Sequence, residues 1–178
     1  MNFQEALEIG EAGESLIARS LLTLGVSVLP IYKTAPTEYK GPRLYSSASG
    51  ALVVPDMLIF KGQKVYWIEA KHKAAFTWHR NTSQWVTGVN LHHYKQYITI
   101  QNERPEWPIW LLFLHRDGVA KDTPDGMTSP TGLFGNALSY LMRNEHHRHE
   151  NHGTGGMVYW NMDALKYLAP LADLVPRQ

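Results

Sequence analysis

The apolar residues at the start of the chain recur at the spacing of one helix face. They are Leu7, Ile17, Leu21 and Leu24. Gly10 and Gly13 weaken the middle of this segment, because glycine is a poor helix former. Gly25 follows as a stop signal, so the pattern predicts a helix over residues 3–24.

Runs rich in β-branched and aromatic residues predict strands in the middle of the chain. They cover residues 26–32, 51–60, 64–70 and 109–115. Gly62 lies in the short connection between the second and third runs, which predicts a tight hairpin there. Residues 91–103 predict a second helix that ends before Pro105. This order of helix, three strands, helix and strand indicates a mixed α/β domain.

The C-terminal part predicts helical additions to that core. An apolar stripe over residues 133–142 predicts one helix, and residues 162–174 predict another, with a short strand between them. Loops are favoured over residues 33–50, 74–90 and 116–131, the second with a short extra hairpin as the alternative. With no linker or repeat, we expect one domain over residues 1–178, with a core of about 8–115 and a C-terminal extension of about 116–178.

Composition limits the kinds of protein that this chain can be. Of its 178 residues, 44% are hydrophobic, enough to bury a core, and none is a cysteine, which excludes disulfides, thiolate metal sites and cysteine nucleophiles. The acidic start lacks the basic segment of a secretory signal, and the longest apolar run, Pro108 to Leu114, is too short to cross a membrane. We therefore expect a soluble, cytoplasmic protein that binds no membrane.

The charge is unevenly distributed, although its formal net value is only +1. Residues 61–104 carry seven Lys and Arg against two Glu, whereas residues 1–24 carry four Glu against one Arg. An ordinary solvated surface explains this as well as a phosphate-facing surface beside an acidic pocket does. Charge alone therefore does not choose between them.

Two carboxylates and a lysine occur where neighbouring strands bring them together. Glu69 and Lys71 share one face of their predicted strand, because side chains alternate along a strand. The hairpin at residues 61–63 brings Asp56 alongside them. Two carboxylates and the carbonyl of Ala70 are hard oxygen ligands of the kind that Mg²⁺ prefers. A lysine beside them is able to hold an attacking water and to neutralise charge on a phosphate.

A Glu-x-Lys triplet by itself is common and equally describes an exposed ion pair on an edge strand. Here Pro55-Asp56 lies upstream on the partner strand, an apolar run precedes each motif, and a helix with glutamates precedes both. The joint pattern favours a nuclease site over the exposed ion pair.

On these residues, Pro55-Asp56 and Glu69-Ala70-Lys71, the sequence resembles the PD-(D/E)xK nuclease superfamily over about residues 8–115. The resemblance implies a restriction-endonuclease-like core of the order αβββαβ, with a mixed central sheet flanked by helices. It implies Asp56, Glu69 and the carbonyl of Ala70 as metal ligands and Lys71 as the catalytic lysine. Mg²⁺ is the implied cofactor, and we expect Mn²⁺ to substitute for it.

Glu14 fits the first-helix acid of the Holliday-junction-resolvase-like branch of that superfamily. It adjoins the apolar residues Ile17 and Leu21, so we expect it to point toward the sheet and to assist both metal binding and catalysis. Glu11 remains the alternative, because the two glycines leave the phase of the helix open.

Candidate DNA contacts follow the lysine strand. The superfamily often has a polar residue, frequently glutamine, on the next helix, and Gln96, His92 and His93 are the candidates here. The segment before that helix is similar in style to resolvase-like nucleases of phages and mobile elements. Its Trp85 and the later Tyr97 favour packing over DNA contact. The expected DNA-binding residues are Lys73, Trp78, His79, Arg80, His92, Tyr94 and Gln96.

Four histidines occur within residues 146–152. Such a cluster is able to bind a transition metal, but neither a cysteine nor a distant pair of spaced histidines frames it. We expect a flexible polar loop that touches phosphate when its imidazoles are protonated.

The sequence thus predicts a Mg²⁺-dependent DNA nuclease, with structure-selective endonuclease action as the first hypothesis. Exonuclease or restriction-like action is the alternative within that class. A catalytically idle nucleic-acid-binding module, an RNA-processing enzyme and a partner-regulated subunit are the hypotheses from other classes. A metal-dependent cleavage assay tests the first, and matched DNA and RNA substrates separate the others. DNA is the expected partner, and whether the chain forms a homodimer stays open.

Overall fold

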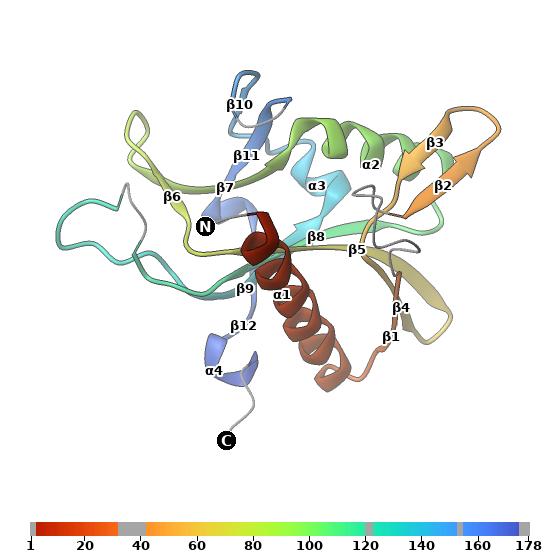
Figure 1. Ribbon diagram of the computed structural model, residues 1–178, viewed down its shortest axis with the longest axis horizontal. Helices are drawn as coiled ribbons and strands as arrows, with labels where there is room; N and C mark the ends of the chain where they lie inside the picture. Colours follow the sequence, from red (N-terminus) through yellow and green to blue (C-terminus); the bar gives the residue numbers. More distant parts are fainter. Residues whose placement is uncertain (1–2, 32–41, 120–122, 153–154, 175–178) are drawn as a thin grey trace.

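A six-stranded sheet forms the centre of the computed structural model, which describes residues 3–31, 42–119, 123–152 and 155–174, with side chains from residue 12 onward. The strand order is β1-β4-β5-β8-β9-β12 (Figure 1). Strands β5 and β8 run parallel and the other neighbours antiparallel, so the sheet is mixed. The strands are β1 (Ser27–Pro30), β4 (Met57–Lys61), β5 (Lys64–Lys73), β8 (Ile109–His115), β9 (Gly132–Ala137) and β12 (Lys166–Ala169).

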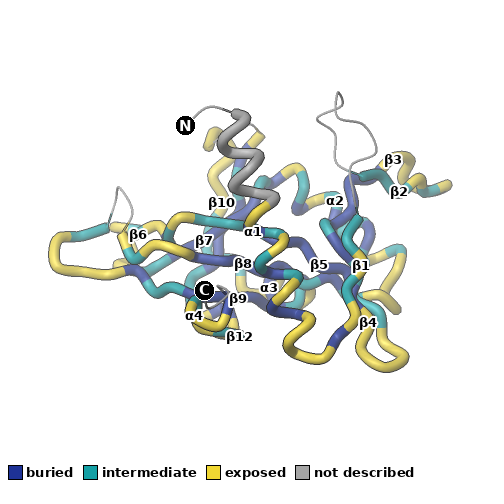
Figure 2. Tube along the Cα trace, turned by 60° about the horizontal axis from the view of Figure 1, so that its bottom comes forward, coloured by how far each residue is buried: buried dark blue, intermediate teal, exposed yellow. Residues whose placement is uncertain are grey.

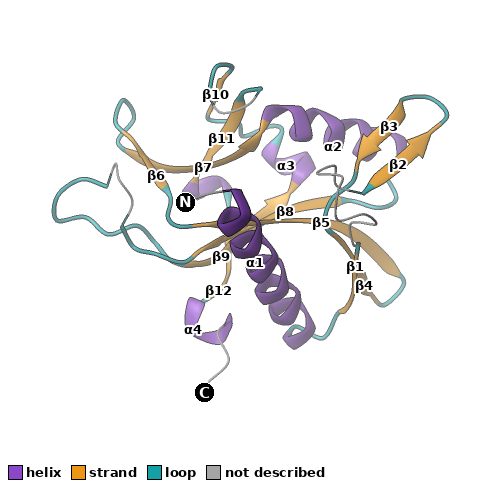
Figure 3. Cartoon of the chain, viewed as in Figure 1, coloured by secondary structure: helices purple, strands orange, loops and turns teal. Residues whose placement is uncertain are grey.

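Two smaller sheets accompany the central one. A four-stranded sheet has the order β10-β11-β7-β6, and β2 pairs with β3 as a hairpin. Both contact helix α2, as Figure 3 shows. Their strands are β2 (Arg43–Ser46), β3 (Gly50–Val53), β6 (Thr77–His79), β7 (Gln84–Asn90), β10 (His147–His149) and β11 (Met157–Asn161), and the helices are α1 (Phe3–Thr23), α2 (Leu91–Glu103), α3 (Leu138–Leu141), η1 (Met162–Ala164) and α4 (Leu171–Leu174).

The central sheet is buried on both faces. On one face Ile17 of α1 packs in a cluster with Ile68 and Leu112, and on the other Tyr97 of α2 packs in a cluster with Leu111. The middle of β5 and most of β8 are accordingly coloured as buried in Figure 2. The side chains of β5 therefore point alternately toward α1 and toward α2.

Helix α1 approaches β5 very closely at Gly13. A Cβ atom at this position would lie 2.4 Å from the Cβ atom of His72, far inside van der Waals contact. Glycine weakens a helix, but here it permits the close approach. The next residue of α1 is Glu14, so this contact also sets how near Glu14 comes to the central strand.

The predicted core is confirmed in its element order. Helix α1, strands β1, β4 and β5, helix α2 and strand β8 follow one another as αβββαβ, with the hairpins β2–β3 and β6–β7 inserted. The predictions of a helix over residues 91–103 and a strand over 109–115 are confirmed to the residue. None of the described helices is long and apolar enough to span a lipid bilayer.

The expected C-terminal helical additions are wrong. Residues 132–137 form strand β9, and only the four residues of α3 follow as helix. The second expected helix is divided into η1, strand β12 and the short α4. The reason is visible in β9, where Leu133 and Phe134 are both buried but in the clusters on opposite faces of the sheet. A strand buried on both faces shows no polar alternation, so its apolar run resembles a helix stripe.

Candidate active site

Asp56 and Glu69 lie opposite each other on neighbouring strands. Met57 of β4 pairs with Ile68 of β5, and continuing this antiparallel register by one residue sets Asp56 against Glu69. The Oδ2 atom of Asp56 accepts a hydrogen bond of 2.8 Å from the backbone N–H of Ala70. This bond fixes the Asp56 carboxylate at the point where β4 begins.

Glu69 is a buried carboxylate that is only half satisfied. Its side chain is 1% exposed, and its Oε1 atom forms an ion pair with Nζ of Lys71. Its Oε2 atom is buried and accepts no hydrogen bond from the described residues, although the hydroxyl of Tyr97 lies near the Glu69 carboxylate. A buried carboxylate oxygen without a partner is costly, which makes this atom a candidate ligand for a cation.

The charges of this site act on one another. Burial raises the pKa of Asp56 to about 7, and the negative charge of Glu69 contributes to the rise while Lys71 opposes it. Burial lowers the pKa of Lys71, but the carboxylates of Glu69, Asp56 and Glu14 outweigh it and hold that pKa above its ordinary value. Lys71 therefore stays protonated, and its single positive charge interacts with the carboxylates of Glu69, Asp56 and Glu14.

These oxygens fit a hard divalent cation. Within the part of the chain that the structure describes, no three His, Cys, Asp or Glu side chains converge as a complete metal cage. Mg²⁺ does not need one, because it is commonly held by one or two carboxylates while it keeps several waters. Asp56 and Glu69 supply such a pair, and the Oε2 atom of Glu69 is the oxygen that the ion pair with Lys71 does not use.

Glu14 lies within electrostatic reach of the site. It is half-buried on α1, directly after Gly13, and its carboxylate contributes to the raised pKa of Lys71. The side chain of Glu11 lies outside the described residues. The charge of Glu14 thus acts on Lys71, and the choice of Glu14 over Glu11 stays a prediction.

The pair of first-helix glutamates gives a direct comparison. We expect Glu14→Gln to lower the rate of DNA cleavage about tenfold or more, because it removes a charge that acts on Lys71. Glu11→Gln should change the rate less than twofold. Rates measured in parallel in Mg²⁺ decide the matter, and the reverse order would transfer the role to Glu11.

Tyr97 lies near the carboxylates of Glu69 and Asp56, although the sequence predicts only a packing role for it. The residue is 1% exposed, and its pKa is raised well above its ordinary value by burial and then by the charges of Glu69 and Asp56. Its hydroxyl therefore stays a neutral hydrogen-bond donor beside the site. Tyr97 follows His93 by one helix turn, and this spacing sets both residues on the same face of α2.

Arg43 brings a positive charge to one side of the site, next to His93. Burial, followed by the charges of Lys71, His92 and Arg43, lowers the pKa of His93 to about 4, so its ring is neutral at pH 7. These groups therefore approach His93 from strand β5, from α2 and from strand β2. Arg43 had no signal in the sequence, because the hairpin that carries it reaches the site only through the fold.

Gln96 and His92 join the β2–β3 hairpin to helix α2. The Oε1 atom of Gln96 accepts a hydrogen bond from the backbone N–H of Val53, so its amide nitrogen faces Nε2 of His92. An amide nitrogen only donates, which makes Nε2 of His92 the acceptor and leaves its proton on Nδ1. The structure thus engages both residues in bracing the hairpin that carries Arg43.

Lys73 and Tyr94 have different surroundings. Lys73 lies two residues beyond Lys71 on the same strand face, and burial, followed by the charge of Lys71, lowers its pKa to about 8. Tyr94 is fully buried, and its hydroxyl donates to Glu145. The structure brings Lys73 to the site and leaves Tyr94 in the core.

Trp78, His79 and Arg80 lie together on the β6–β7 hairpin. Trp78 packs edge-on against Trp85 at 4.9 Å between ring centroids, whereas Arg80 is exposed. His79 points to the other face of the hairpin, where its ring lies 4.9 Å from that of His146 and 4.6 Å from that of His147.

The expectation of a flexible loop over the histidine cluster is wrong for its first half. Residues 147–149 form strand β10, which pairs with β11, and His147 stacks on Tyr159 at 4.5 Å. Burial, followed by the charge of His79, lowers the pKa of both His146 and His147. His79, which is distant in the sequence, also packs against His146 and His147, and sequence spacing does not reveal such a contact.

The histidine cluster should be dispensable for the chemistry. Replacing His146, His147, His149 and His152 by Ser should leave the Mg²⁺-dependent cleavage rate at pH 8 within about threefold. The lowered pKa values of His146 and His147 keep these two imidazoles neutral at that pH, and the proposed chemistry uses none of the four. Zinc that copurifies with the protein, and is lost together with activity on this replacement, would contradict the expectation.

The chain was compared with known proteins in sequence and in structure. In sequence, no family model and no curated protein matches it. In structure, it is similar to Hjc, a Holliday junction resolvase from the archaeal hyperthermophile Archaeoglobus fulgidus, with a TM-score of 0.47, 9% identity and coverage of 87% of this chain and 90% of that chain. It is also similar to D212, a nuclease from a fusselovirus, with a TM-score of 0.43, 11% identity and coverage of 88% and 86%. At this level of similarity the comparisons assign no residue a role.

Proposed function

We propose that the protein is a Mg²⁺-dependent deoxyribonuclease that hydrolyses phosphodiester bonds at Asp56, Glu69 and Lys71. The observation that carries the proposal is the half-satisfied Glu69, which is buried, paired with Lys71 through one oxygen and unpartnered at the other. It faces a second carboxylate whose pKa is raised to about 7. An apolar side chain at position 69 would avoid the free-energy cost of burying a charge. A bound cation is therefore the best explanation for a buried carboxylate at this position.

The metal would be held by Asp56, Glu69 and the carbonyl of Ala70, with Glu14 assisting directly or through water. When bound, Mg²⁺ supplies Lewis acidity toward a phosphoryl oxygen and toward a ligated water, and we expect Mn²⁺ to replace it. Lys71 orients the attacking water and neutralises charge that develops on the phosphate. Cleavage leaves a 5′-phosphate.

DNA is the proposed substrate, and structure-selective endonuclease action is the first form of the proposal. The exposed or half-exposed candidates for DNA contact are Lys73, Trp78, His79, Arg80 and His92, while Gln96 braces the β2–β3 hairpin. Arg43 adds positive charge near His93 and Lys71, where a phosphate would approach.

A cleavage panel tests this function. The purified chain is incubated with single-stranded, duplex, flap and four-way DNA, in Mg²⁺ and with a chelator. We expect cleavage of at least one branched or partly single-stranded DNA in Mg²⁺ and none with chelator. Cleavage that survives both the chelator and Asp56→Asn would remove the site, and cleavage of matched RNA in preference to DNA would change the substrate class.

A further inference from the structure

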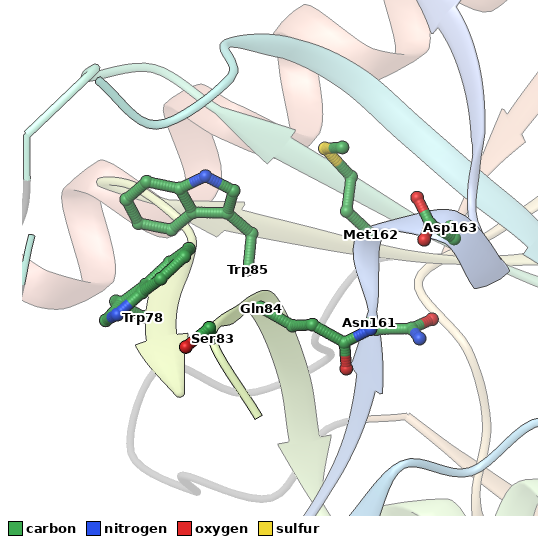
Figure 4. Close-up of a pocket in the computed structure, with 7 residues that line it drawn as sticks. All are labelled: Trp78, Ser83, Gln84, Trp85, Asn161, Met162 and Asp163. Atoms are coloured by element: carbon green, nitrogen blue, oxygen red, sulfur yellow. The ribbon is translucent and has the colours of Figure 1, made fainter. Parts of the chain in front are cut away.

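A small pocket opens on the β6–β7 hairpin, close along the chain to the proposed active site. Its volume is about 180 Å³, and it is lined by side chains of this hairpin and of residues 161–163 (Figure 4). In Figure 4 the rings of Trp78 and Trp85 lie on one side, and Met162 and Asp163 lie on the other. The catalytic proposal uses none of these groups except Trp78.

The aromatic side of the pocket is suited to a flat ring. Trp78 and Trp85 are directly opposite each other in the hairpin, and their rings meet at an interplanar angle of 69°. Both indoles remain half-exposed, although tryptophan is a large apolar residue that usually gains from full burial. Indole faces of this kind stack on nucleobases, which all present a π-face.

The polar side of the pocket favours a base over a phosphate. Gln84 contributes a primary amide and the exposed Asp163 a carboxylate, while the Oδ1 atom of Asn161 is occupied by the backbone N–H of Ala164. The lining contains neither lysine nor arginine. A carboxylate repels phosphate and accepts hydrogen bonds from the amino group of a base.

The distance between the pocket and the proposed active site is limited by the short segment that joins them. Phe76, between β5 and β6, is fully buried, donates its backbone N–H to Ser129 and stacks on His115 at 3.7 Å. Trp78 follows Lys71 by seven residues, which span at most about 25 Å. At about 3.4 Å per nucleotide along a stacked strand, this reach covers about seven nucleotides.

We propose that this pocket binds one unpaired nucleobase with an exocyclic amino group, within about seven nucleotides of the cleaved bond. The inference rests on the proposed nuclease function and adds to it a physical basis for selecting branched DNA. A base inside a duplex is stacked on both sides and paired at its edge, so it is not available to the pocket. A single-stranded arm offers such a base at no unpairing cost.

Abasic scanning tests the proposal. A duplex with a cytosine-containing single-stranded arm is prepared with one abasic residue at each of the seven positions on either side of the cut. We expect kcat/KM in Mg²⁺ to fall about tenfold at one position and little elsewhere, the size typical of one lost base stack. Thymine at that position should also be cut more slowly than cytosine. A flat profile for the parent protein would overturn the proposal.

Variants connect the effect to the pocket. Trp78→Leu should remove the response to the abasic residue, and Asp163→Asn should remove the difference between cytosine and thymine. Trp107→Leu, which alters a partly exposed tryptophan outside the pocket, should leave both responses intact. Because the side chain of Asp163 is exposed, its variant remains informative even where Trp78→Leu unfolds the hairpin. If Asp163→Asn distinguishes cytosine from thymine as strongly as the parent protein does, the proposed role of the amino group is wrong.

The same scan, measured as equilibrium binding of Asp56→Asn in Ca²⁺, separates the two proposals. Position-dependent binding without any cleavage by the parent protein would reject the nuclease function and retain the pocket. Cleavage with a flat binding profile would retain the nuclease function and reject the pocket.

Discussion

Asp56→Asn is expected to slow Mg²⁺-dependent cleavage at least about a hundredfold, because it removes a charged oxygen from the proposed metal ligands. The asparagine keeps the size of the side chain and an oxygen that can accept the hydrogen bond from Ala70. The variant should therefore fold. Initial rates on the preferred DNA measure the effect, and Asp117→Asn, at an exposed aspartate, is the matched control.

The same variant has an opposite effect on stability. The pKa of Asp56 in the folded protein, about 7, is above its ordinary value of 3.8. The unfolded chain therefore loses this proton at lower pH than the folded one does, and the metal-free fold is weakened as the pH rises from about 4 to 7. We expect metal-free Asp56→Asn to melt at a higher temperature than the parent at pH 8 and at a similar one at pH 4. A lower melting temperature at pH 8, together with unchanged cleavage, would mean that Asp56 serves structure alone.

Lys71→Met should separate binding from catalysis. Methionine retains most of the apolar stem but removes the ammonium that pairs with Glu69. A single lost phosphate contact lowers the salt dependence of binding by about one unit of slope, so DNA affinity in Ca²⁺ should change little. Cleavage in Mg²⁺ should fall about a hundredfold or more, because a positioned charge acts on the transition state. Both are measured on one DNA, and Lys166→Met on the exposed edge strand β12 is the control.

Removing Lys71 also leaves two buried carboxylates without their cation. The metal-free variant should melt at a lower temperature than the parent, and Mg²⁺ should raise its melting temperature more than it raises that of the parent. Equal losses of DNA binding and cleavage would make Lys71 a DNA contact, and the proposed chemistry would fail at that residue.

The parts of the fold that depend on local signals could be predicted from the sequence. Helix α2 has a capping Asn90, whose Oδ1 accepts hydrogen bonds from the N–H groups of His92 and His93, and prolines after its end. The turn at Gly62 has the positive φ, 60°, that glycine favours. Such features act within a few residues, so they are readable without the fold.

Features that depend on distant partners could not be predicted. Leu133 and Phe134 belong to a strand because β8 and β12 flank it, and nothing within residues 132–142 signals those neighbours. At the proposed active site, Asp56, Glu69 and Lys71 are joined by a short hairpin and were within reach of sequence analysis. Arg43 reaches it by the packing of a hairpin on α2, and His79 meets His146 across 67 positions of the chain. Contacts of that length leave no periodic pattern.

The close contact between Gly13 and His72 has a consequence for how this chain can change. A larger residue at position 13 would improve the intrinsic stability of α1 by about 1 kcal/mol, yet it would push the helix away from β5 and carry Glu14 with it. A substitution at position 13 that stabilises helix α1 would therefore impair the proposed chemistry. Substitutions should therefore be tolerated at many exposed positions of α1 before one is tolerated at Gly13.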